Sequence, residues 1–125
     1  MKKRILYIED NPQNRLLVKR ILQREGYEML EAADGEKGWE MALQEMPDFI
    51  FVDLLLPDID GFELTRKIKS APELSHIPVV TITSYGNKET ERIAKEAGVD
   101  GFLHKPPDKQ LIQSILNRFL RVTIA

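Results

Sequence analysis

The sequence predicts an α/β fold, with one doubly wound, five-stranded parallel sheet and five helices on its two faces. Strand-like and helix-like segments alternate five times along the chain with short connections, a pattern typical of parallel sheets covered by helices. The segment Phe49–Val52 is also continuously apolar, as expected for a strand whose two faces are both covered. A chain of 125 residues is long enough for one such domain with a hydrophobic core.

The first part of the chain contains two strand–helix units. Residues 5–8 are apolar and predict a buried strand, and Asn11 then suits the N-cap of a helix that Gly26 can end. Residues 29–32 predict a weaker strand, and Asp34 can cap a second helix. The apolar positions expected to face the core are Leu17, Val18, Ile21 and Leu22 in the first helix, and Trp39, Ala42, Leu43 and Met46 in the second.

The remaining elements continue the alternation. They are a strand at 49–52, a helix at 61–70, a strand at 79–82, a helix from 87 to 98, a strand at 102–104 and a last helix from 108. Asn87 and Asp108 can cap the helices that follow them, and Gly98 suits a helix end. The expected core positions are Phe62, Leu64 and Ile68 in the third helix and Leu111, Ile112, Ile115, Leu116, Phe119 and Leu120 in the last.

Polar side chains follow four of the five predicted strands. Glu9 and Asp10 follow the first strand, Asp53 the third, Thr83 the fourth and Lys105 the fifth. Ligands of open parallel sheets bind beyond the carboxyl ends of the strands. We therefore expect these five residues to share one site.

The residue types at this site indicate a divalent cation and phosphoryl chemistry. Mg²⁺ takes oxygen ligands and keeps several waters, so Asp10 and Asp53 could bind it directly and Glu9 directly or through water. An aspartate such as Asp53 can also act as a nucleophile and form an aspartyl phosphate. The oxygens of that phosphoryl group could then be neutralised by Mg²⁺, the Lys105 ammonium and the Thr83 hydroxyl.

Composition excludes several other classes of protein. A net charge of −2 gives no reason to expect direct binding of nucleic acid or of an anionic membrane. The absence of cysteine excludes disulfides, a thiol nucleophile and a thiolate metal site. No apolar stretch approaches membrane-spanning length, and the apolar run after the basic N-terminus is too short for a signal peptide. We therefore expect a cytoplasmic protein.

Four short motifs, in this order, resemble those of the receiver domain of two-component response regulators, of the single-domain kind. The motifs are Ile-Glu-Asp at 8–10, Asp-Leu-Leu-Leu-Pro-Asp-Ile-Asp-Gly at 53–61, Thr-Ser at 83–84 and Phe-Leu-His-Lys-Pro at 102–106. The resemblance covers essentially the whole chain. It implies the flavodoxin-like fold of chemotaxis receivers (CheY-like), with strand order 2-1-3-4-5. It also implies a single receiver domain over residues 1–125, in which residues 121–125 are a short tail with no output domain after it.

The resemblance assigns the acidic residues their roles. It makes Asp53 the phosphoacceptor and Glu9 and Asp10 the acidic pair of a Mg²⁺ site. The backbone carbonyl of Leu55 would be the remaining protein ligand, so its apolar side chain does not prevent metal binding. The first acid is Glu9 where receivers more often have aspartate, and its longer arm could reach the metal through water.

The resemblance also assigns a switch. Thr83 and Lys105 would contact the phosphoryl oxygens, and Phe102 would turn inward when Thr83 is drawn toward the phosphate. Phe102 lacks the hydroxyl of a tyrosine switch, so packing alone would stabilise its inward state. Lys105–Pro106 would be a cis peptide, and Pro107 would stiffen the loop that follows it.

Two positions that flank the path of the hydrolytic water in receivers are Leu55 and Tyr85. Leucine cannot hold a water molecule, and a bulky tyrosine can shield the phosphoryl group. The sequence therefore predicts slow autodephosphorylation.

The implied function is a phosphorylation-dependent signalling switch. A sensor histidine kinase or a histidine phosphotransfer protein would donate the phosphoryl group to Asp53. The chain would catalyse only its own phosphorylation and slow dephosphorylation, and so would not be an enzyme in the usual sense. A downstream protein target would bind the face formed by the fourth helix, fifth strand and fifth helix, and the first helix, with Arg15, Lys19 and Arg20, would be another contact surface.

Two other functions agree less well with the sequence. A phosphatase of the haloacid-dehalogenase type also uses an aspartate and Mg²⁺, but it needs an acid where this chain has Leu55, and no cap insertion is present. A phosphorylation-independent scaffold is disfavoured because all five pocket residues are present. Asp58 and Asp60 are expected to be turn residues. His76 and His104 are not expected to bind metal or carry phosphate, because neither has a partner at ligand spacing.

Overall fold

The computed structural model describes residues 2–84 and 86–120. Within these residues, five parallel strands form one sheet in the order β2-β1-β3-β4-β5, which confirms the predicted fold class and strand order. In chain order the elements are β1 (Arg4–Ile8), α1 (Pro12–Arg24), β2 (Glu28–Ala32), α2 (Gly35–Glu45), β3 (Phe49–Val52), α3 (Gly61–Ser70), β4 (Val79–Thr83), α4 (Lys88–Ala97), β5 (Gly101–His104) and α5 (Lys109–Leu120).

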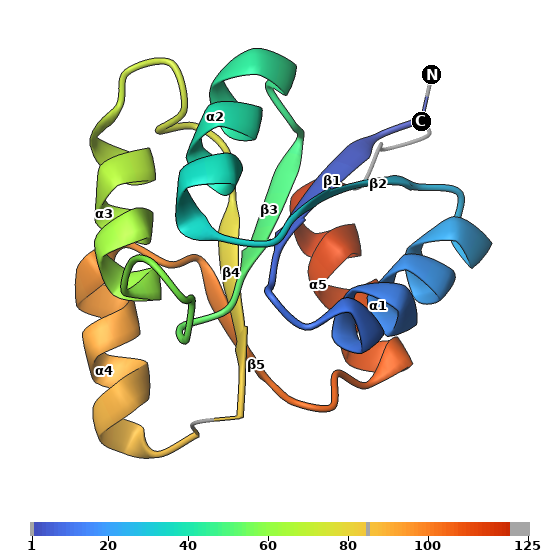
Figure 1. Ribbon diagram of the computed structural model, residues 1–125. Coiled ribbons are helices and arrows are strands. Elements are labelled where there is room, and N and C mark those ends of the chain that lie inside the picture. The colour runs from blue at the N-terminus through green and yellow to red at the C-terminus, as the bar shows by residue number, and fades with distance from the viewer. Residues whose placement is uncertain (1, 85, 121–125) are drawn as a thin grey trace.

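Helices cover both faces of the sheet. Figure 1 shows α1 and α5 on one face and α2, α3 and α4 on the other. The chain therefore has three layers, as doubly wound sheets do. None of the helices in the described part of the chain is long and apolar enough to cross a membrane.

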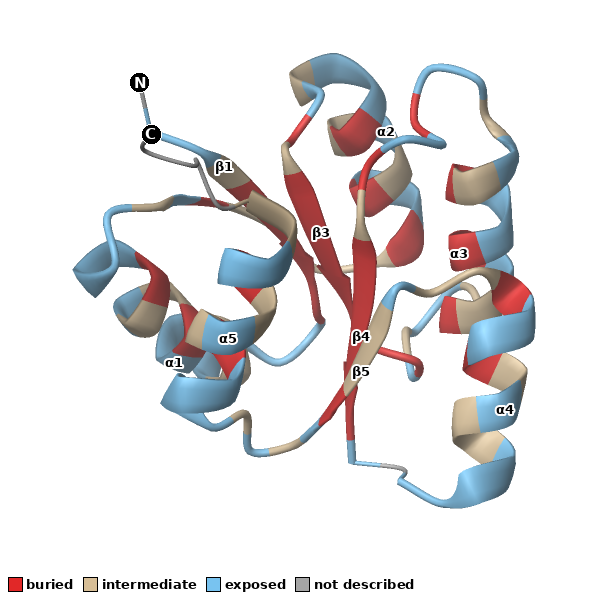
Figure 2. Cartoon of the chain, turned by 180° about the vertical axis from the view of Figure 1, so that it is seen from behind, coloured by how far each residue is buried: buried red, intermediate tan, exposed pale blue. Residues whose placement is uncertain are grey.

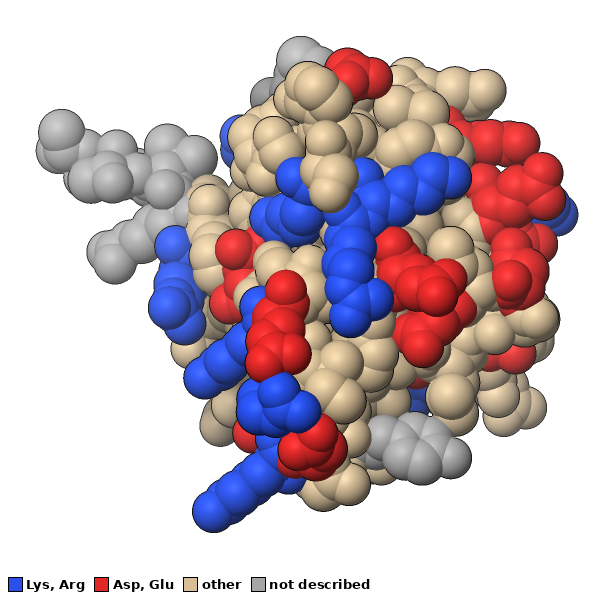
Figure 3. Space-filling view, turned by 90° about the vertical axis from the view of Figure 1, so that its left-hand side faces the viewer, with Lys and Arg blue, Asp and Glu red and all other residues tan. Residues whose placement is uncertain are grey.

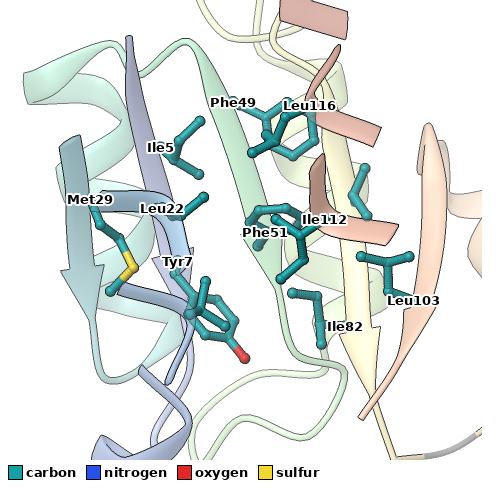
Figure 4. Packing of buried hydrophobic residues seen from close by; sticks show 12 residues of the cluster. Ile5, Tyr7, Leu22, Met29, Phe49, Phe51, Ile82, Leu103, Ile112 and Leu116 are labelled. Carbon is teal, nitrogen blue, oxygen red and sulfur yellow. The ribbon is translucent and has the colours of Figure 1, made fainter. Parts of the chain in front are cut away.

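The central strands are buried on both faces (Figure 2), because their apolar side chains alternate between two cores. Phe49 and Phe51 point toward α1 and α5, where their ring centroids lie 4.8 Å apart and where Tyr7 packs edge-on to Phe51 (Figure 4). Ile50 and Val52 point the other way, toward α2 and α3. This packing explains why β3 can deliver a carboxylate at its end without exposing its own residues.

The cap residues and the glycines predicted at helix ends are confirmed. Gly26, just after α1, and Gly98, at the end of α4, adopt positive φ angles of 85° and 106°, a conformation that favours glycine. The predicted caps all accept backbone N–H groups of the helix that follows: Asn11, Asp34, Asn87 and Asp108.

Four residues predicted to face the core are exposed. Leu17, Leu43, Met46 and Leu111 keep between 37% and 54% of their surface accessible. The buried stripe of each helix is therefore narrower than the apolar pattern of the sequence suggests. Met46 also leaves the helix, because it adopts a left-handed conformation (φ 46°) that ends α2.

Candidate functional site

The sheet itself positions the functional residues that follow its strands. Its hydrogen-bond ladder continues one residue beyond three of the strands. The backbone N–H of Glu9 donates to β2 (2.9 Å), that of Asp53 to β1 (3.0 Å) and that of Lys105 to β4 (2.9 Å). These residues are therefore placed as rigidly as the strands, and they converge at one edge of the sheet as predicted.

Lys105 joins the two buried carboxylates of this edge. Its Nζ lies 3.0 Å from both carboxylate oxygens of Glu9 and 2.9 Å from Oδ2 of Asp53. Glu9 is 1% exposed and Asp53 is 4% exposed. A pair of carboxylates withdrawn from water in this way requires a compensating cation, and the ammonium group provides it.

Asp10 completes an acidic group that could hold a divalent cation. One carboxylate oxygen from each of Glu9, Asp10 and Asp53 lies within 4.8 Å of the others. Asp10 is exposed, whereas the other two are buried, so the group opens to solvent on one side. An all-oxygen donor set with room for water fits Mg²⁺.

The electrostatics of the site favour a bound cation. Burial raises the pKa of Glu9 to about 7, and the neighbouring Asp53 carboxylate adds to the rise, whereas hydrogen bonds from Asn14 and Lys105 oppose it. Burial by itself would lower the pKa of Lys105, but its hydrogen bonds to Asp53 and Glu9 outweigh that effect and raise it. Lys105 therefore stays charged, whereas the ionised form of Glu9 is destabilised by burial and by the neighbouring Asp53 carboxylate.

This raised pKa predicts a pH dependence of stability in metal-free buffer. Because the pKa of Glu9 is about 7 in the folded state and near its ordinary value of 4.5 in the unfolded chain, the folded state binds a proton more tightly at pH values between these two. Stability should therefore fall as pH rises through this interval, by on the order of 1 kcal/mol more in the wild type than in Glu9→Gln. Urea unfolding at about pH 5 and about pH 8 measures the difference. An equal change in the two proteins would contradict the assignment.

Two residues of the first turn of α1 support Glu9. Nδ2 of Asn14 donates to Oε1 of Glu9 (2.8 Å), and Nη1 of Arg15 donates to the Glu9 backbone carbonyl (2.7 Å). Arg15 also pairs with Glu31 on β2 (3.1 Å). The contact of Asn14 was not predicted from the sequence, and Arg15 was predicted only as part of a contact surface on the first helix. Their position could have indicated these contacts, because the helix that carries Asn14 and Arg15 begins shortly after Glu9 and Asp10.

The predicted switch residues lie at the ends of neighbouring strands. Thr83 is fully buried at the end of β4. Phe102 is half-buried on β5, opposite Thr81 of β4, and lines a cavity of about 180 Å³ between β5 and α4. The peptide bond between Lys105 and Pro106 is cis, as the resemblance implied. The switching roles of Thr83 and Phe102 stay predictions.

The loop after β3 is tied to its surroundings at both ends. The backbone N–H of Leu55 donates to Oδ1 of Asp53 (3.3 Å), while the Leu55 side chain is 57% exposed. Leu55 also forms an isolated antiparallel bridge with Asp60. Its predicted role as a carbonyl ligand stays a prediction, and Tyr85, predicted to shield the phosphoryl group, lies outside the described residues.

Asp58 and Asp60, assigned to a turn from the sequence, also bind helix N-termini. Asp60 caps α3 by accepting the backbone N–H of Phe62 (2.7 Å). Asp58 reaches across to α2 and accepts the N–H groups of Gly35 (2.8 Å) and Glu36 (2.9 Å), which lower its pKa. The loop that carries Asp53 is thus pinned to two helices. Sequence patterns could not show the contact to α2, because it spans more than twenty residues.

The face that carries α3 and α4 has side chains of both charges interspersed (Figure 3). On α4, Arg92 pairs with Glu89 and Glu96, and Glu91 lies 3.7 Å from Nε2 of the exposed His104. His76 lies at the opposite edge of the sheet, in a cavity next to the start of β4.

Comparisons with known proteins agree with this geometry. The family model for the response regulator receiver domain matches residues 5–117. The polar-differentiation response regulator DivK of Brucella anthropi is 32% identical over 106 residues, which cover 85% of this chain and 86% of DivK.

Two solved structures are similar over nearly their whole length. The chemotaxis response regulator CheY4 of Vibrio cholerae has a TM-score of 0.89 and 28% identity, with 96% of this chain and 100% of that chain covered. The receiver domain of a sensor histidine kinase from Pseudomonas aeruginosa, with a magnesium ion coordinated in its active-site cleft, has a TM-score of 0.87 and 29% identity, with 95% and 98% covered. With its sheet order and its acidic edge, this chain belongs to the response regulator receiver domain family of two-component systems.

Proposed function

We propose that this chain is a phosphorylation-dependent switch in which Asp53 accepts a phosphoryl group in a reaction that requires Mg²⁺. One observation carries the proposal, namely that a single ammonium group, that of Lys105, bridges Asp53 and Glu9 at distances of 2.9 and 3.0 Å. Asp10 lies beside this pair and completes an oxygen donor set for the cation. A nucleophile, a metal site and a fixed positive charge are thereby gathered in one place, as phosphoryl transfer requires.

The two carboxylate oxygens of Asp53 accept hydrogen bonds from different donors. Oδ2 accepts a hydrogen bond from the ammonium group of Lys105 (2.9 Å), and Oδ1 accepts a longer one from the backbone N–H of Leu55 (3.3 Å). In the proposed transfer, a carboxylate oxygen of Asp53 forms the bond to phosphorus as the bond between phosphorus and the histidine nitrogen of the phosphodonor breaks. Lys105 is close enough to neutralise the oxygens of the transferred group, and bound Mg²⁺ would supply further positive charge.

The phosphodonor is proposed to be a sensor histidine kinase or a histidine phosphotransfer protein, acting in the cytoplasm. Membership of the receiver family supports a partner of this kind. The phosphorylated state is proposed to act through Thr83 and Phe102 on a downstream protein that binds the face formed by α4, β5 and α5. The half-buried position of Phe102 beside a cavity supports this, because its ring has space to change position.

The haloacid-dehalogenase alternative gains no support from the site. The residue two positions after Asp53 is Leu55, whose side chain is exposed and offers no acid to a leaving group.

The test of the proposal is phosphorylation by acetyl phosphate with and without Mg²⁺, read by intact mass. Wild-type protein should gain one phosphoryl group with Mg²⁺ and none in EDTA.

Asp10→Ala should weaken Mg²⁺ binding and slow phosphorylation together, each by at least about tenfold, equivalent to ~1.4 kcal/mol. It should also be more stable than wild type in metal-free buffer, because one repelling carboxylate is gone. Normal phosphorylation of this variant without divalent cation would refute the metal site.

The lifetime of the phosphorylated state should be minutes or longer. Hydrolysis needs a water in line behind the phosphoryl group, and neither leucine nor tyrosine at positions 55 and 85 is suited to orient it. The double substitution Leu55→Asn with Tyr85→Glu should speed the decay by about tenfold. Radiolabelled protein followed after donor removal measures the rate. Complete loss from wild type within seconds would be incompatible with this argument.

A further inference from the structure

The two carboxylate oxygens of Glu9 have unequal support. Oε1 accepts hydrogen bonds from two donors, Nδ2 of Asn14 at 2.8 Å and Nζ of Lys105 at 3.0 Å. Oε2 accepts a hydrogen bond from Lys105, also at 3.0 Å, but none from Asn14. If Lys105 moves toward a phosphoryl group, Oε1 keeps its hydrogen bond from Asn14, whereas Oε2 loses the hydrogen bond that it accepts from Lys105.

Asn14 is itself held firmly. It lies in the first turn of α1, and its backbone N–H is accepted by the Asn11 cap (3.2 Å). The next residue, Arg15, grips the backbone carbonyl of Glu9 at 2.7 Å. The first turn of α1 therefore fixes both the backbone and the side chain of Glu9 from one rigid element.

The chemistry of the Asn14 donor suits a cation site. An amide N–H stabilises an ionised carboxylate through a charge-assisted hydrogen bond, but it carries no net charge that would repel a divalent cation. A glutamate has one more rotatable bond than an aspartate, so binding a cation orders it at a greater entropic cost. A donor that already fixes the carboxylate reduces that cost.

We propose that Asn14 is a positioning residue for the divalent cation, because it retains Oε1 of Glu9 and leaves Oε2 to pass from Lys105 to the cation. This inference rests on the proposed function, since it places the cation at the same acidic group. It adds that the glutamate of this chain depends on a partner in α1.

The test is a Mg²⁺ titration of the whole chain followed by amide chemical shifts. Asn14→Ala should raise the Kd for Mg²⁺ by about three- to tenfold, the loss expected for one hydrogen bond to a charged group. Gln13→Ala is the matched control, because Gln13 is an exposed neighbour in the same turn. It should leave the Kd within about twofold of wild type, the range expected of a surface substitution.

A second background separates positioning from a merely structural role. In Glu9→Asp the side chain is one methylene shorter, so its carboxylate should lie beyond the reach of Asn14. Asn14→Ala should then leave the Kd of Glu9→Asp unchanged, whereas general loosening of α1 would raise the Kd in both backgrounds. An equal rise in both, or no rise with Glu9 present, overturns the inference alone. Failure of the wild type itself to bind Mg²⁺ removes the proposed function, and the inference with it.

Discussion

Asp53→Asn should eliminate phosphoryl incorporation from acetyl phosphate in the presence of Mg²⁺. The amide cannot attack phosphorus as the carboxylate does, and the other acids of the site are unsuited to replace it. Glu9 has both oxygens bonded to Lys105, and one of them also to Asn14, while Asp10 is exposed and has solvent around it. Loss should therefore be complete within detection, which corresponds to at least about a thousandfold in rate, or ~4 kcal/mol. Intact mass measured over time gives the result.

The matched control is Asp60→Asn, in the same loop. Asparagine caps a helix about as well as aspartate, so the cap of α3 should survive and phosphorylation should proceed at close to the wild-type rate. Incorporation that persists in Asp53→Asn would show that another residue is the phosphoacceptor. Equal loss in both variants would show instead that the loop, and not the carboxylate of Asp53, determines the reaction.

The fold was predictable because its signals are local. Asn11 and Asp108 cap helices by contacts two or three residues away, and the apolar run at 49–52 identifies a central strand by itself. The convergence of Asp53 and Lys105 followed from topology, because parallel strands place their carboxyl ends at one edge. The site was therefore visible in outline as soon as the strands were assigned.

What the sequence did not reveal depends on distances in space. The contact of Asp58 with the N-terminus of α2 and that of Asn14 with Glu9 each require the relative placement of two elements. The exposure of Leu17 and Leu111 has the same origin, because which edge of an apolar stripe is covered depends on how closely the helix approaches the sheet. Periodicity gives the stripe but not its width.

Gly61→Ala should destabilise the chain by about 2 to 3 kcal/mol, more than Gly26→Ala does. A Cβ atom at Gly61 would lie 2.5 Å from the carbonyl oxygen of Asp53 and 2.6 Å from Cα of Leu54. Both are backbone atoms, so no side-chain rotation can relieve the overlap. The Gly61 N–H also donates to the Leu54 carbonyl at 3.0 Å, which keeps the start of α3 pressed against this loop.

Gly26→Ala separates this close approach from the general cost of replacing glycine. Nothing lies within 4 Å of a Cβ at Gly26, and only its positive φ of 85° opposes the change, at a cost of about 1 kcal/mol. Urea unfolding of the two variants should therefore rank Gly61→Ala well below Gly26→Ala in stability. Because the clash falls on the backbone of Asp53, Gly61→Ala should also slow phosphorylation in conditions where it remains folded, whereas Gly26→Ala should not. Equal stability of the two variants would mean that the loop after β3 can move to relieve the overlap with the added Cβ. The geometry of the site would then depend on the hydrogen bonds of the Lys105 side chain rather than on the backbone that carries Asp53.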